Sequence, residues 1–171
     1  MGSRDEPAGV EGPRRGPRAR APLFSLLFDH EPRQREEAQP RRVLSREHLV
    51  ESILGELSRL LNTRCSTTIA GLEGQERTVM NYGLPDFTTL NPTSDGDRQR
   101  LGRLIVEAVR AFEPRLRNPL VEVKADAVNG RVLRVRVDGM LVMEHLSEPV
   151  SFPLVIEERG GAIILGQAAV T

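Results

Sequence analysis

The residues best suited to chemistry are Glu113 and Arg115, a carboxylate and a guanidinium separated only by Pro114. A glycosidase needs two facing carboxylates, one of them protonated, and Asp86 or Asp97 could supply the second. Because the nearby guanidinium favours the ionised form of Glu113, the pair does not suit an acid catalyst. We therefore interpret the pair as an ion pair or as a clamp on a neighbouring protein.

Other patterns typical of catalysis are missing from the sequence. It contains no Gly-x-Ser-x-Gly, no phosphate loop and no GxGxxG. Cys65 is the only cysteine, which excludes an internal disulfide and a cysteine metal cluster and fits a reducing, cytoplasmic setting. The histidines show no ligand spacing: His30, His48 and His145. The sequence predicts a protein that is not an enzyme and has no cofactor or metal.

Two amphipathic helices precede the Glu113–Arg115 pair. The second runs from about 97 to 112, and Pro114 ends it by disfavouring helical geometry at Glu113. Ser94, Asp95 or Asp97 could cap its start. The first begins after Ser45 as N-cap and ends near residue 62 or 63. Each has an apolar stripe at helical spacing: Leu49, Ile53, Leu57, Leu60 and Leu61 in the first, and Leu101, Leu104, Ile105, Ala108, Val109 and Phe112 in the second.

After this pair the hydrophobic period changes to two, which predicts strands at about 119–127, 131–142, 149–157 and 161–165. A three-residue hairpin loop over 128–130, with Gly130 left-handed, places apolar residues opposite one another, whereas a two-residue loop would pair Val123 with Arg136. The preferred register pairs Val121, Val123 and Ala125 with Val137, Val135 and Leu133. Gly160-Gly161 marks the next turn. The predicted class is α+β, with N-terminal helices packed on a small, mainly antiparallel β-sheet and preceded by a disordered tail.

Composition divides the 171 residues into a tail and a domain. Residues 1–42 form a disordered tail and linker, and 43–171 form one domain with room for a sizeable core. The tail carries an apolar island, 23–28, which either folds back or docks on a partner through Phe24, Leu26 and Leu27. The 24 basic and 24 acidic residues balance, so no global field favours nucleic acid, and no apolar run approaches the roughly 20 residues that span a bilayer.

The loop between the helices, 64–91, is shaped rather than flexible. Tyr82 is the only tyrosine and can anchor it, and Gly83 suits a positive backbone angle. Four segments occur in order along the chain: Leu60-Leu61-Asn62-Thr63-Arg64, Val79-Met80-Asn81-Tyr82-Gly83-Leu84-Pro85-Asp86, Phe112-Glu113-Pro114-Arg115-Leu116 and Ser151-Phe152-Pro153-Leu154. Together they resemble the TssE family of type VI secretion baseplate subunits, which is related to a phage baseplate wedge protein historically labelled a lysozyme. The resemblance covers roughly residues 43–165.

The resemblance implies a structural subunit of a cytoplasmic baseplate docked at the inner membrane. The implied partners are the TssF, TssG and TssK subunits and the first ring of the contractile sheath, without nucleic acid or membrane insertion. Carried onto this sequence, the partner-binding residues are Glu113, Pro114 and Arg115, with Tyr82, Gly83, Leu84, Pro85 and Asp86 beside them. Two alternatives remain open at this point. One is a regulatory anti-adaptor of the same fold, similar to IraD, and the other is a peptidoglycan hydrolase.

Overall fold

The computed structural model describes residues 46–126, 132–143 and 146–156, together with the backbone of 19–20, 43–44 and 163–165. The remainder of the expected tail, 1–42, lies outside the described residues, as do Ser45 and the turns at Gly130 and Gly160. At the backbone level, β1 (Ala19–Arg20) pairs antiparallel with β2 (Val43–Leu44).

The two predicted helices are confirmed. Helix α2 (Arg46–Asn62) buries its whole apolar stripe, and α4 (Asp95–Phe112) does the same except for the partly exposed Phe112. Ser94 is the N-cap of α4, its side chain accepting from the backbone N–H of Asp97, and acidic residues follow in the first turn. Glu113 is the C-cap, so α4 ends where Pro114 predicts.

The main sheet has four antiparallel strands in sequence order, β3 (Leu116–Ala125), β4 (Leu133–Met143), β5 (Leu146–Ile156) and β6 (Ile163–Leu165). The hairpin register expected from parity is confirmed, with Val121, Val123 and Ala125 opposite Val137, Val135 and Leu133. Glu122 lies opposite Arg136, and their side chains form an ion pair on the outer face at 3.3 Å.

Strand β3 begins at Leu116, three residues before the predicted start, because it contains a bulge. Arg117 pairs with Met140 but Leu120 pairs with Asp138, so β3 has one extra residue between these pairs. Asn118 takes a positive φ of 50° there. Simple alternation would send Leu116 and Val121 to opposite faces, and the extra residue lets both face the helices.

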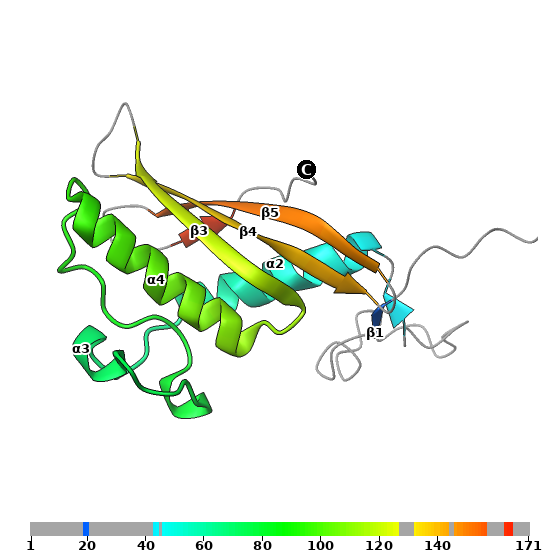
Figure 1. Ribbon diagram of the computed structural model, residues 1–171, viewed down its shortest axis with the longest axis horizontal. Helices are drawn as coiled ribbons and strands as arrows, with labels where there is room; N and C mark the ends of the chain where they lie inside the picture. Colours follow the sequence, from blue (N-terminus) through cyan, green and yellow to red (C-terminus); the bar gives the residue numbers. More distant parts are fainter. Residues whose placement is uncertain are drawn as a thin grey trace, which may run out of the picture.

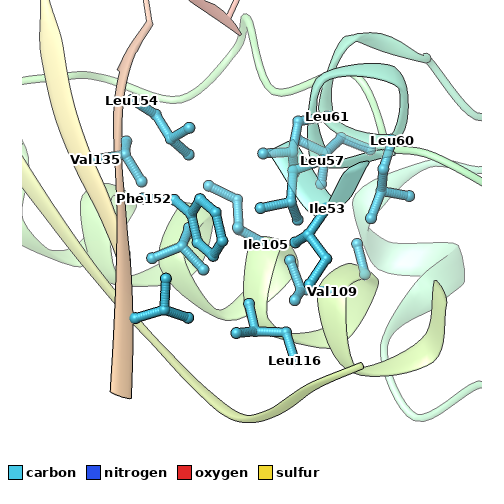
Figure 2. Packing of buried hydrophobic residues seen from close by; sticks show 14 of the residues in the cluster. Ile53, Leu57, Leu60, Leu61, Ile105, Val109, Leu116, Val135, Phe152 and Leu154 are labelled. Atoms are coloured by element: carbon cyan, nitrogen blue, oxygen red, sulfur yellow. The ribbon is translucent and has the colours of Figure 1, made fainter. Parts of the chain in front are cut away.

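The fold has two layers, with α2 and α4 on one face of the sheet (Figure 1). Alternate residues of β4 and β5 point into the core, and Figure 2 shows Phe152 of β5 directed toward Ile105 of α4. The opposite face of the sheet is charged, and it carries ion pairs joining Glu122 to Lys124, Arg136 to Asp138, and Arg134 to Asp126. The helices and the inner sheet face thus make one hydrophobic core.

Between α2 and α4 the chain forms a structured loop that contains two short helices, α3 (Ile69–Leu72) and the 3-10 helix η1 (Val79–Asn81). In Figure 1 this green segment projects from the molecule on the side of α4 away from β5. The loop lies next to the helix layer, close to the end of α4.

Candidate partner-binding site

Glu113 and Arg115 form a two-point ion pair at the end of α4. The Nε of Arg115 donates to Oε1 of Glu113 at 2.7 Å and Nη2 donates to Oε2 at 2.5 Å. The backbone N–H of Arg115 also donates to Oε1, at 3.2 Å. Glu113 is only 2% exposed, whereas the side chain of Arg115 is 21% exposed. The carboxylate is therefore an internal partner of the arginine, and Arg115 is the partly exposed member of the pair.

The same turn links three elements of the fold. Leu116 N–H donates to the carbonyl of Glu113 at 3.1 Å, which closes the turn around the exposed Pro114. The Arg115 carbonyl accepts from Val142 N–H of β4 at 3.1 Å, and Nη1 of Arg115 donates to Oγ of Ser52 on α2 at 3.1 Å. We call the turn 113–116 the corner. Its geometry depends on α2, α4 and β4 together.

Tyr82 connects the loop to the corner. Its ring packs edge-on against Phe112, the last residue of α4, with 5.0 Å between centroids. Burial raises the pKa of the Tyr82 hydroxyl, and the nearby carboxylates of Glu56 and Glu113 raise it further while Arg59 lowers it. These electrostatic contacts place Tyr82 beside both the corner and the Glu56–Arg59 turn of α2. The expected role of Tyr82 as the aromatic anchor of the loop is confirmed.

Gly83 and Leu84 fasten the loop to the end of α2. The N–H of Leu84 donates to the Thr63 carbonyl and the N–H of Cys65 donates to the Leu84 carbonyl, both at 2.9 Å. Gly83 has a φ of +101°, and a Cβ placed there would lie 2.4 Å from the Thr63 carbonyl oxygen. Only glycine fits a position with both constraints.

The last two predicted loop residues differ in accessibility. Pro85 is buried, together with Gly83 and Leu84, whereas Asp86 is exposed. Hydrogen bonds from the Thr88 hydroxyl and N–H to Asp86 Oδ1 lower the pKa of that carboxyl. Arg64 stacks over the Phe87 ring at 4.4 Å. The buried residues thus shape this surface, and the predicted residues that reach it are Tyr82, Asp86, Pro114 and Arg115.

Sequence reasoning missed several residues of this region. Ser52 contacts Arg115 from 63 positions away and has no local signal. Arg77 donates through Nη1 to the carbonyls of Asn81 and Gly83, at 3.2 and 3.3 Å. Val79 and Met80 are adjacent apolar residues that are both exposed on η1. The tail motif of Phe24, Leu26 and Leu27 lies outside the described residues, and its docking role stays a prediction.

Comparison with known proteins identifies the family. The family model described as "Baseplate wedge protein gp25" matches residues 47–146, which include the loop and the corner. The chain belongs to the gp25 baseplate wedge family. The resemblance inferred from the four sequence segments is confirmed at this level, and the coarse function that follows is that of a baseplate subunit.

One solved structure similar to this gp25-family chain is described as "The baseplate complex from the type VI secretion system". A chain of that structure is 21% identical, with a TM-score of 0.47; the match covers 65% of this chain and 96% of the other. None of the curated proteins matches. Among the described residues, no cluster of three or more metal-binding side chains occurs, and no helix is long and apolar enough to cross a membrane.

Proposed function

We propose that this gp25-family chain is the TssE-type baseplate subunit of a type VI secretion system. It joins the wedge through the corner and the adjoining loop, and it gives the contractile sheath a platform for assembly. The observation that carries the proposal is the Glu113–Arg115 pair, which lies within the family-matched segment and holds the partly exposed Arg115 side chain in a fixed position. Its wedge partners are TssF, TssG and TssK, in a baseplate on the cytoplasmic side of the inner membrane.

The geometry of Glu113 supports a structural role over a catalytic one. Both of its carboxylate oxygens accept hydrogen bonds from Arg115, and the side chain is buried. A general acid must instead present a proton to a substrate. The other candidate carboxylates have local hydrogen bonds too, Asp86 with Thr88 and Asp97 with the Asn91 N–H. We therefore propose that the protein is not a peptidoglycan hydrolase.

The sheath platform that we propose lies on the sheet. Strand β3 is an edge strand of the main sheet and has ten residues. A groove of about 670 Å³ runs between it and α4, with Leu120, Val121 and Val123 among its lining residues. An edge strand can add a strand of another chain through main-chain hydrogen bonds. The corner and β3 give the subunit two separate contact regions.

Co-purification with TssF and TssG tests the wedge assignment. Arg115→Lys keeps the charge but loses the two-point fork, so we expect about a tenfold or greater loss of wedge affinity. Arg134→Lys is the matched control, because Arg134 is an exposed arginine in an ion pair on the outer sheet face. A second variant lacks residues 1–30 and tests the tail motif.

The outcomes separate the rival assignments. Loss of the complex with Arg115→Lys but not with Arg134→Lys supports attachment through the corner. Loss on deleting residues 1–30 alone moves the attachment to the Leu23–Phe28 island. A folded wild-type chain that binds neither TssF nor TssG contradicts the baseplate assignment and favours the anti-adaptor alternative.

A further inference from the structure

Two adjacent apolar side chains stand in solvent at η1. Val79 is 83% exposed and Met80 is 84% exposed. Among the described residues, the other large hydrophobic side chain exposed to this degree is Leu120 on β3, at 70%. Single exposed apolar residues are common on protein surfaces, but a neighbouring pair on an ordered turn is a small contiguous patch. We call residues 79–80 the knob.

The knob is held in shape by its own turn. The Thr78 hydroxyl accepts from the N–H of Met80, and the Thr78 N–H donates to the Asn81 side chain at 2.8 Å, which completes a capping box. The Tyr82 N–H donates back to the Val79 carbonyl at 3.4 Å. A partner would thus meet a turn that is already ordered, so little conformational entropy is lost on binding.

Arg77 hydrogen-bonds the turn through one nitrogen of its guanidinium and leaves its other two nitrogens without acceptors among the described residues. Nη1 bonds the Asn81 and Gly83 carbonyls, but Nε and Nη2 are buried and meet no acceptor in the part of the chain that the structure describes. Buried donors without acceptors are uncommon and destabilising. The turn thus has two unfavourable features, buried donors without acceptors and two apolar side chains exposed to solvent. Unfavourable features of this kind are typical of functional sites.

The knob also belongs to the surface that carries the corner. Tyr82 directly follows η1 and packs on Phe112, which is the residue before Glu113. In Figure 1 the segment containing η1 projects from the body of the molecule. A projecting knob next to the corner can enter a partner that the corner also touches.

We infer that Val79 and Met80 insert into a concave apolar pocket on the wedge subunits that bind the corner. The inference rests on the proposed function and names a second anchor for the same contact. A protruding apolar turn complements a pocket rather than a flat or charged surface. The flexible thioether of Met80 fits irregular apolar pockets and makes favourable contacts with aromatic rings.

Affinity measurements on the full chain provide the first test. We expect Met80→Ala to weaken binding to TssF–TssG by about tenfold, and Val79→Ala with Met80→Ala to weaken it by about a hundredfold. Thermal unfolding should not change, because both side chains are exposed. Arg134→Ala is the control, since it truncates an exposed side chain on the outer sheet face, away from both the corner and the groove, and its affinity for TssF–TssG should stay within about twofold of wild type.

A fluorescent probe tests burial directly. Cys65 is the only cysteine, so Cys65→Ser with Met80→Cys carries one environment-sensitive dye at the knob, and Cys65→Ser with Arg134→Cys carries it at the control position on the outer sheet face. A blue shift at position 80 alone on adding TssF–TssG supports the pocket. If the wild type binds TssF–TssG but the knob variants bind equally well and show no shift, the inference is wrong and the wedge assignment stands.

Two further outcomes are distinct from these. If the wild type does not bind TssF–TssG at all, the proposed function fails and the inference fails with it. If the dye at position 80 shifts on adding unlabelled copies of this same chain, and sedimentation shows self-association that Met80→Ala abolishes, the pocket lies on a second copy. That result also overturns the inference.

Discussion

Replacing Arg115 by methionine should destabilise the domain strongly. The change leaves the carboxylate of Glu113, which is 2% exposed, with only the N–H of residue 115 as a donor from the corner. Removing one partner of a buried ion pair typically costs about 3–5 kcal/mol, because the remaining charge is buried without compensation. Since a domain of this size has about 5–15 kcal/mol of stability in total, the loss should be evident in any unfolding curve.

Two features of the corner change the expected loss in opposite directions. The Arg115 side chain is 21% exposed, so water screens part of the pair. The hydrogen bond from Nη1 to Ser52 adds about 1 kcal/mol to the loss. We therefore expect Arg115→Met to lower the free energy of unfolding by about 3 kcal/mol. This also makes Arg115→Glu a poor probe of partner binding, because it would set a second carboxylate beside the buried one.

The double variant, Glu113→Leu with Arg115→Met, measures the interaction between the two side chains separately from their contacts with the rest of the protein. Apolar residues of similar volume can replace a buried ion pair at little cost, so the double variant should unfold within about 1–2 kcal/mol of the wild type. The coupling energy of the cycle should then be about 2–3 kcal/mol. Urea unfolding of the four full-length proteins, followed by far-ultraviolet circular dichroism, measures it.

Either of two results would refute this reasoning about the corner. One is a pair of single variants that each lose less than about 1 kcal/mol, as exposed ion pairs do. The other is a set of losses that simply add, with no coupling. If the stable double variant also keeps wedge binding, the pair only braces the fold; if it loses binding at unchanged stability, Arg115 is a contact as well.

Three further predictions test the loop and the helices. Gly83→Ala should lower the free energy of unfolding by several kcal/mol, because the position combines a positive φ with a backbone clash. Gly55→Ala should raise it by about 0.5–1 kcal/mol, because a Cβ there meets nothing within 4 Å. Urea unfolding of both variants measures these changes. Tyr82 is the only tyrosine, so the absorbance of tyrosinate reports its pKa alone, and we expect that pKa to lie above the usual range for tyrosine. Because folding raises the pKa, the contribution of Tyr82 to stability is complete below its pKa in the unfolded chain and is lost as the pH rises through its pKa in the folded protein. Glu56→Gln should lower the pKa of Tyr82, and an unchanged pKa would contradict the assigned electrostatics. Ser94→Ala should cost about 1 kcal/mol through loss of the α4 cap, measured by thermal unfolding.

Local patterns were sufficient to predict the helices and the hairpin register. Pro114 ends α4 by its own stereochemistry, and the parity of Val121, Val123 and Ala125 against the strand that follows admits one register. The bulge at Asn118 was not predicted. It allows the side chain of Leu116 to face the core, and the position of that side chain depends on contacts with β4 and the helices. A period of two shows which residues share a face, but it does not show where a strand needs an extra residue.

The candidate site was predictable only in part, for the same reason. The resemblance pointed to the loop and the corner, but it could not show that Glu113, Leu84 and Pro85 face inward while Val79 and Met80 face solvent. Those directions are set by contacts between distant segments. Ser52 meets Arg115 across 63 positions, and no local pattern records this.

The proposed contact through the corner would make one short motif serve both folding and recognition. Pro114 ends α4, Glu113 is a buried carboxylate whose charge Arg115 compensates, and the side chain of Arg115 is itself partly exposed. Because folding already orders the guanidinium, a partner that binds it loses little side-chain entropy. A lysine could keep the charge but not the fork, so folding and the proposed recognition would favour the same residue at position 115.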